Sequence, residues 1–411
     1  MELGKSEKPV EMTFNMPTYY QLLFLYVDFA EIARATQQQI MADLTSLSID
    51  NDRVEILHNP RLDNVKKEVP SVALLIGSVK AKADADVVNL VNELIAANIP
   101  ILPIVPHGES FSAVVPEALH PINALTWESA SAGPRVSAWL LRILGLTEKQ
   151  RRIFVSYRRA DALLMGEQIW EELTKAGFDV FLDRFGIDPA ENFQERLTDR
   201  LGDKAFVLLI ESPEARESRW VLHEVNYARK HQLGFLAVTW PATKTQNRFV
   251  DGIFEKYRHY LCDSDLKLRD GQTVLKDEFF PHLATLVEQR HAAAMLRRRR
   301  DMLGSIIQEL RRNKLPFTQL TDWTLVVEKS TGHRLISVTP RPPEIPDLFY
   351  LDTHASGYNR GPLEFSWLIH STAQYHGDRR TLLDWAVSGR KLGIESADKI
   401  VELVDTLTSS S

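Results

Sequence analysis

The stretch from Ile153 to Trp240 constrains the fold of this chain more than any other part. Four short apolar runs within it alternate with segments of helical periodicity, and polar residues follow each run. The runs cover residues 153–155, 178–182, 205–210 and 235–238. Buried strands that alternate with helices build a parallel sheet that is covered on both faces. We therefore predict a doubly wound α/β domain in this part of the chain.

The same rhythm of strands and helices occurs once earlier in the chain. The corresponding strands lie near Leu23 and Phe154, near Leu74 and Leu208, and near Ile101 and Phe235. Their spacings agree within a few residues, and the segments 74–78 and 208–212 have similar sequences. This pattern predicts a duplicated α/β unit. The alternative is two unrelated parallel-sheet domains that share only the order of strands and helices.

The length of 411 residues exceeds the usual size of a single hydrophobic core. We predict an α/β domain over residues 1–145, a second over 150–290 and an α+β domain over 295–411. The composition of residues 128–135 is typical of a linker between the first two domains.

The pattern within the last domain is mixed. Residues 323–327 and 334–338 are predicted to form a β-hairpin. Residues 348–351 resemble a strand, and a long helix is expected from residue 279 into the basic stretch Arg297–Arg300. Further helices are predicted over residues 363–375, 381–392 and 396–407, the last with Ser396 as its N-cap.

Composition and charge exclude several classes of protein. A net charge of −6 gives no overall attraction to nucleic acid or to an anionic membrane. The single cysteine, Cys262, allows no internal disulfide, which is typical of a reducing, cytoplasmic location. The sequence shows neither a signal peptide nor a membrane span. We expect no metal site, because His333, His354, His370 and His376 lack tight ligand spacing with a carboxylate.

Candidate functional residues follow the strands of the second α/β unit. Ligands of doubly wound sheets bind beyond the carboxyl ends of the strands. The polar residues after the first strand are Ser156, Tyr157, Arg158 and Arg159. A loop that contains Asp188 follows the second strand, and Trp220 and Glu224 come after the third. Because Trp220 and Glu224 are four positions apart on a predicted helix, they share one face of it.

These residue types suit a dinucleotide substrate. Arginines bind a pyrophosphate, an indole covers a base or sugar, and a carboxylate stabilises a developing ribosyl cation. One carboxylate could suffice for NAD+, because nicotinamide leaves as a neutral base without protonation. Two simpler interpretations stay open at this point. Trp220 could belong to the core, and Glu224 could be a solvated helix residue or a partner of Arg229.

The segments 154–159, 177–183 and 218–224 resemble characteristic stretches of the Toll/interleukin-1 receptor (TIR) domain, a flavodoxin-like α/β fold. The resemblance covers about residues 151–265 and is closest to the NAD-cleaving, bacterial immune-effector branch, which carries a Trp-x-x-x-Glu pair. It implies an NAD+ glycohydrolase that needs no cofactor, with Glu224 as the catalytic residue. Residues implied at the substrate are Trp220, Tyr157, Arg158, Arg159, Ser156 and, in a gating loop at 184–189, Asp188.

The resemblance also implies self-association through TIR domains and a role in antiphage abortive infection. The first α/β unit resembles a degenerate copy, since Asn89 or a neighbour stands where the catalytic glutamate would be. The last domain is a candidate sensor that binds an activating ligand or a partner protein. The alternative function is a non-catalytic TIR scaffold that signals by self-association.

Overall fold

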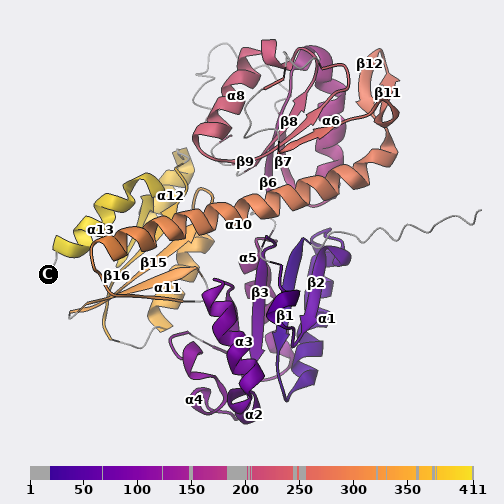
Figure 1. Cartoon of the computed structure of the whole chain (residues 1–411). Coiled ribbons are helices and arrows are strands. Elements are labelled where there is room, and N and C mark those ends of the chain that lie inside the picture. Colours follow the sequence, from indigo (N-terminus) through magenta and orange to yellow (C-terminus); the bar gives the residue numbers. More distant parts are fainter. Residues whose placement is uncertain are drawn as a thin grey trace, which may run out of the picture.

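A single long helix holds together three five-stranded sheets in the computed structural model of the chain (Figure 1). The residues that the structure describes are 19–66, 68–122, 124–147, 151–182, 201, 204, 206–243, 248–249, 256–320, 323–329, 331–357, 361–372, 375 and 377–409. The multi-domain layout with an α/β domain at its centre is as predicted.

The N-terminal domain contains a parallel sheet in the order β2-β1-β3-β4-β5. Its strands are β1 (Tyr20–Leu25), β2 (Val54–His58), β3 (Ser71–Ile76), β4 (Ile101–Pro106) and β5 (Leu125–Trp127). The helices around it are α1 (Ala30–Ser46), α2 (Val79–Ala83), α3 (Ala85–Ala96), α4 (Phe111–Val114) and α5 (Gly133–Leu144). The strands β1, β3 and β4 are buried along their whole length, because both faces of the sheet are covered.

The central domain repeats this topology. Its strands are β6 (Arg152–Ser156), β7 (Asp179–Leu182), β8 (Phe206–Glu211), β9 (Gly234–Thr239) and β10 (Arg258–Tyr260), in the order β10-β9-β8-β6-β7. All four pairings are parallel, so both sheets have the flavodoxin-like order 2-1-3-4-5. Helix α6 (Arg159–Lys175) and helix α8 (Arg219–Lys230) lie on opposite faces of the sheet. A hairpin of β11 (Leu266–Arg269) and β12 (Gln272–Leu275) packs against α6.

The C-terminal domain has a mixed sheet in the order β13-β14-β15-β16-β17. The strands are β13 (Phe317–Gln319), β14 (Thr324–Lys329), β15 (Gly332–Thr339), β16 (Leu363–His370) and β17 (Leu392–Ser396). The first three pair antiparallel, which confirms the predicted hairpin, and the last three pair parallel. The helices α11 (Ile345–Gly357), α12 (Gly377–Val387) and α13 (Ile400–Ser409) complete the α+β domain.

Helix α10 (Phe280–Arg312) connects the three domains (Figure 1). Its first half, including Leu283 and Val287, packs into the core of the central domain. Its second half, including Ile306 and Leu310, packs into a core that the N-terminal and C-terminal domains share. The boundary expected between residues 290 and 295 therefore falls inside a continuous helix.

Several predicted elements were wrong. Residues 363–375 contain strand β16 rather than a helix, and residues 348–351 lie in helix α11. The predicted helix at 381–392 ends at Val387 and β17 follows it, while the expected linker at 128–135 already contains the start of α5. Ser396 precedes the last helical segment, but its side chain makes no capping hydrogen bond. The order β15-α11-β16-α12-β17 explains why strands and helices were predicted in each other's place. Its three strands are parallel, and a crossover helix must connect each strand to the next.

Candidate functional site

The site is organised around the side chain of Glu224 in helix α8. Ser218 precedes this helix, and its hydroxyl accepts a hydrogen bond from the backbone N–H of Val221 at 3.4 Å. The cap places Glu224 in the second turn, where its side chain turns toward the sheet and is only 6% exposed. The Ser156 hydroxyl, at the carboxyl end of β6, donates a 2.5 Å hydrogen bond to the Glu224 carboxylate. Glu224 is therefore a held, buried carboxylate and not a solvated helix residue.

Trp220 lies one turn before Glu224 on the same helix. Its side chain is 50% exposed, so it is not part of the core. An exposed indole thus precedes a buried carboxylate along one face of α8. This arrangement provides a flat, exposed apolar side chain near the start of α8 and a buried carboxylate one turn further along the helix.

The structure separates Tyr157 from the Ser156–Glu224 pair. Successive side chains along an extended strand point to opposite faces of the sheet. Ser156 points to the α8 face, whereas Tyr157 is buried in the core on the α6 face, against Gly166. Tyr157 therefore supports the turn between β6 and α6 from within the core.

Arg158 connects two of the loops at the carboxyl edge of the sheet. Its guanidinium lies 2.7 Å from the Glu214 carboxylate, 3.8 Å from Asp161 and 3.9 Å from Glu217. These carboxylates follow β8 or begin α6, so the arginine joins the segments after β6 and β8. Arg159 lies at the start of α6 and is exposed.

Asp188 and the predicted gating loop at 184–189 lie outside the residues that the structure describes.

Glu211 is a second buried carboxylate at the carboxyl edge of the sheet, and no role was predicted for it. Arg258 binds it through Nε at 2.9 Å and through Nη2 at 3.1 Å, and Thr239 donates to it at 2.5 Å. Glu211 therefore joins β8, β9 and β10. A glutamate that ends an apolar strand is the only sign of this role in the sequence.

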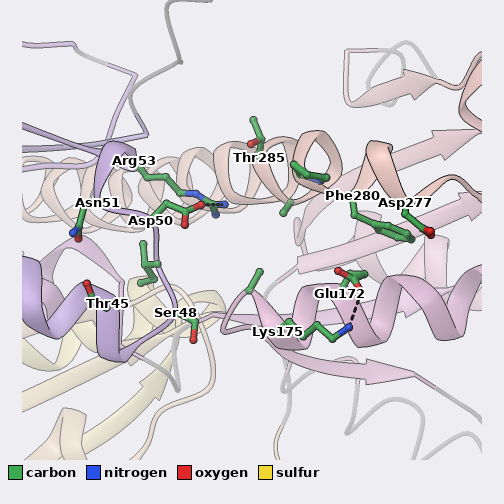
Figure 2. Close-up of a pocket in the computed structure, with 14 residues that line it drawn as sticks. Thr45, Ser48, Asp50, Asn51, Arg53, Glu172, Lys175, Asp277, Phe280 and Thr285 are labelled. Carbon is green, nitrogen blue, oxygen red and sulfur yellow. Dashed lines mark hydrogen bonds and ion pairs between the residues drawn. The ribbon is translucent and has the colours of Figure 1, made fainter.

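A cavity of about 680 Å³ lies elsewhere, between the N-terminal and central domains (Figure 2). It is bordered by the ends of α1 and α6 and by the start of α10. Its charged groups are paired: Lys175 lies 2.8 Å from Glu172, and Arg53 lies 2.8 Å from Asp50. This cavity therefore has no surplus positive charge for a pyrophosphate, and Glu224 is not among its lining residues.

Within the part of the chain that the structure describes, no three His, Cys, Asp or Glu side chains come together as a metal site. The same part contains no helix with the length and apolar character needed to cross a membrane.

A five-stranded parallel sheet in this order, with a buried carboxylate at its carboxyl edge, defines a doubly wound α/β domain, a fold whose ligands bind beyond the strand ends. Residues 153–257 match the family model of the TIR domain, so the chain contains a TIR domain in its central part. No protein among the curated ones matches the chain.

Solved structures show only distant similarity. The TIR domains of the activated Roq1 resistosome, which directly recognises the pathogen effector XopQ, are 16% identical, with a TM-score of 0.21. That match covers 34% of this chain and 83% of the other. Proximal thread matrix protein 1 from the mussel byssus is 11% identical over 67% of this chain and 96% of its own, also with a TM-score of 0.21.

Proposed function

We propose that the protein is an NAD+ glycohydrolase that cleaves the bond between nicotinamide and ribose. The observation that carries the proposal is the Glu224 carboxylate, which is buried, bonded to Ser156 and placed one turn after the exposed Trp220. The TIR family match over residues 153–257 supports it, because NAD+ cleavage is an activity of that family.

The chemistry requires one negative charge near the ribose. The bond from C1′ of the ribose to the nicotinamide nitrogen breaks, and its electron pair neutralises the pyridinium. The ribosyl carbon becomes cationic, and the fixed carboxylate of Glu224 stabilises that charge. A water molecule then attacks C1′ and loses a proton, which gives ADP-ribose. Attack by an adenine nitrogen instead of water would give a cyclic product.

The proposal also includes the other substrate contacts that the family resemblance implies. We assign Trp220 to the nicotinamide and ribose, and Arg158 and Arg159 to the pyrophosphate. Ser156 orients the catalytic carboxylate. Tyr157, which is buried on the opposite face of the sheet, has an indirect role. Asp188 is included as a substrate contact because the family resemblance implies it. Self-association through TIR domains and antiphage defence are proposed on the family resemblance.

The N-terminal domain lacks this pair of residues. Ser156 pairs with Leu209 of β8, and Leu75, the counterpart of Leu209 in the similar segment 74–78, pairs with Leu25. The register therefore places Leu25, on the α3 face of its sheet, at the position of Ser156. Asn89, on the corresponding helix α3, is exposed. We assign the activity to the central domain alone.

The test is incubation of the purified full chain with NAD+ over a range of protein concentrations, with nicotinamide release followed by chromatography. Glu224→Gln should lower turnover by about 100-fold or more, because it removes the charge but keeps the shape. Glu93→Gln is the matched control, since Glu93 is exposed on the equivalent helix α3, and it should leave turnover unchanged.

Turnover by Glu224→Gln at the rate of the unaltered protein would contradict the proposal. So would an unaltered protein that releases no nicotinamide at any concentration. Either result would leave the non-catalytic TIR scaffold as the better account of this fold. In that case self-association should be unchanged in the Glu224→Gln variant.

A further inference from the structure

A second cavity lies between the N-terminal and C-terminal domains, away from Glu224. Its volume is about 190 Å³. Strands β4 and β5 and helix α5 contribute one wall, β15 and helix α11 the other, and Arg299 of α10 lies between them. The lining combines two positively charged side chains with aromatic rings and hydroxyl groups.

Arg299 brings a positive charge into this cavity without an ion pair to any described carboxylate. Its Nη1 donates to the backbone carbonyl of Ile143 at 3.2 Å. Among the described residues, no acidic side chain forms an ion pair with it. Asp347 also lines the cavity, but its two oxygens accept from Arg341 at 3.1 Å and from the backbone N–H of Glu344 at 2.9 Å.

Arg299 stays charged at neutral pH although its surroundings disfavour the charge. Burial, followed by the positive charges of Arg142 and Arg341, lowers its pKa to about 10, while the charge of Asp347 acts in the opposite direction. Arg299 is half-buried, and a charge removed from water without an acidic partner is unfavourable. An anionic ligand would offset that cost.

Trp323 adds a second, independent sign of a ligand site. Its backbone has a φ of 67°, in the left-handed region that a bulky residue rarely adopts and that is concentrated at ligand sites. The side chain is 6% exposed, and its indole N–H has no acceptor among the described residues.

A smaller hollow of about 20 Å³ shares Arg299 and Trp323 with the cavity. It has room for about one water molecule, which could accept from the indole. A neutral water would not balance the charge of Arg299, so it does not replace an anion.

Two guanidinium groups lie over aromatic rings in the cavity wall. The Arg299 guanidinium is 5.4 Å from the centre of the Trp323 ring, and that of Arg142 is 4.1 Å from the centre of the Tyr350 ring. Such surfaces bind a flat π system on one side and an anion at their edges.

We propose that this cavity binds a planar aromatic ring that carries one anionic group. Arg299 binds the anion and Trp323 donates its indole N–H to the ligand. A volume of about 190 Å³ is below that of sites for drug-sized molecules and slightly above the ~150 Å³ that accommodates one benzene ring. The ligand is therefore one or two rings in size. The hydroxyls of Ser337 and Thr339 are available to its ring substituents.

The test uses isothermal titration of the full chain with five probes. Benzoate and naphthalene-2-carboxylate carry the anion as a carboxylate, and phenyl phosphate carries it as a phosphoester. Benzamide and phenol are their neutral counterparts. We expect at least one anionic probe to bind about ten-fold or more tightly than its neutral counterpart, as a charged hydrogen bond predicts. Preference for a carboxylate or for phenyl phosphate would identify the chemical class of the anion.

Arg299→Gln should weaken binding of that probe by about ten-fold or more. Arg312→Gln is the matched control, because this arginine is on the same helix and its side chain is 75% exposed. Thr353→Phe fills the cavity from its exposed rim without changing a charge, and it should also abolish binding. Melting curves of each variant show that it is folded.

Three results would overturn the proposal. The first is that none of the anionic probes binds the unaltered protein. The second is equal binding of the charged and neutral probes. The third is unchanged affinity in both Arg299→Gln and Thr353→Phe. None of these results depends on NAD+ cleavage, so this site and the proposed activity are tested separately.

Discussion

The Ser156 hydroxyl is a hydrogen-bond partner of the Glu224 carboxylate, the group that we propose as catalytic. Because this hydroxyl donates to Glu224 at 2.5 Å in a buried setting, Ser156→Ala leaves the charge in place but less firmly held. We expect kcat for NAD+ cleavage to fall about ten-fold with little change in KM, since a hydrogen bond to a charged group contributes roughly 1.5–3 kcal/mol.

Ser212 provides the control for this experiment. It is a fully buried serine that follows β8, and its hydroxyl has no hydrogen-bond partner in the described part of the chain. Ser212→Ala should leave kcat unchanged. Equal losses in Ser156→Ala and Ser212→Ala would show that small cavities at this edge, and not the bond to Glu224, lower the rate.

His370 is a buried titratable residue at the end of β16. Burial lowers its pKa to about 4, although the carbonyl of Ser371 and the charge of Asp398 favour the protonated form. Its ring also lies edge-on to Tyr375, with 5.1 Å between the centres. The unfolded state therefore binds a proton between pH 6.5 and about 4 that the folded state does not bind. The resulting stability is fully present above pH 6.5 and is lost as the pH falls toward 4.

The corresponding prediction concerns the free energy of unfolding at pH 7.5 and at pH 4.5. The loss between these two values should be about 2–3 kcal/mol smaller in His370→Gln than in the unaltered protein. Urea titrations at both pH values measure it. His107→Gln replaces an exposed histidine and should keep the full loss. A pH dependence in His370→Gln equal to that of the unaltered protein would show that other groups titrate.

At the scale of elements, the turn from α6 to β7 packs directly on the N-terminal domain. Gly177 in this turn has a φ of 78°, and a Cβ there would lie 2.3 Å from the backbone carbonyl of Leu47, just after α1. The clash is with a backbone atom, so it cannot be relieved by a side-chain rotation. Glycine is therefore required both by its own conformation and by the approach of the other domain.

Gly177→Ala should lower the free energy of unfolding by about 2–4 kcal/mol, from backbone strain and overpacking together. Gly271→Ala isolates the strain, because Gly271 has a φ of 75° and open space around it. That control should cost only about 1 kcal/mol. Urea unfolding of the two variants measures the difference, and equal losses would mean that the domain contact adds nothing.

The elements of the two parallel domains were predictable because their strands are continuous apolar runs between helices. In the C-terminal domain the same kind of evidence failed. Residues 363–370 carry apolar side chains at positions that also suit a helix, and pairing with β15 and β17 decides that they form a strand. The local sequence pattern does not indicate that β15 and β17 pair with this segment.

The candidate site likewise has one feature that the sequence predicts and others that depend on the folded sheet. Spacing alone places Trp220 and Glu224 on one helix face, as the structure has them. The bond from Ser156 to Glu224 joins residues 68 positions apart, and it depends on how the sheet brings β6 and α8 together. The burial of Tyr157 depends in turn on Gly166, whose missing side chain leaves room for the ring.

At the scale of the whole molecule, the N-terminal and central domains meet at Glu288 in helix α10. This glutamate is fully buried. Tyr20, the first residue of β1, donates to it at 2.5 Å, and Arg53 before β2 donates at 3.2 Å. Arg151, just before β6, also donates to Glu288 and binds the carbonyls of Ala176 and Gly177 at 3.1 and 3.0 Å. One carboxylate thus connects the N-terminal domain, the central domain and the helix that enters the C-terminal domain.

Glu288 is held ionised by this cluster. Burial alone would raise its pKa, but Arg151, the hydroxyl of Tyr20 and Arg53 together lower the pKa below its ordinary value. Removing the carboxylate leaves Arg151 buried without its acidic partner. A change of this kind typically costs about 3–5 kcal/mol, more than the pair itself contributes.

Glu288→Ala should therefore lower the free energy of unfolding by about 3–5 kcal/mol and separate the unfolding of the central domain from that of the other two. Urea unfolding followed by fluorescence and by limited proteolysis would reveal this as two transitions in place of one. Asp301→Ala removes an exposed acid from the same helix and should change neither the midpoint nor the number of transitions. A single, unshifted transition in Glu288→Ala would mean that the apolar packing of α10 alone joins the domains, because the buried charges would then contribute nothing to their connection.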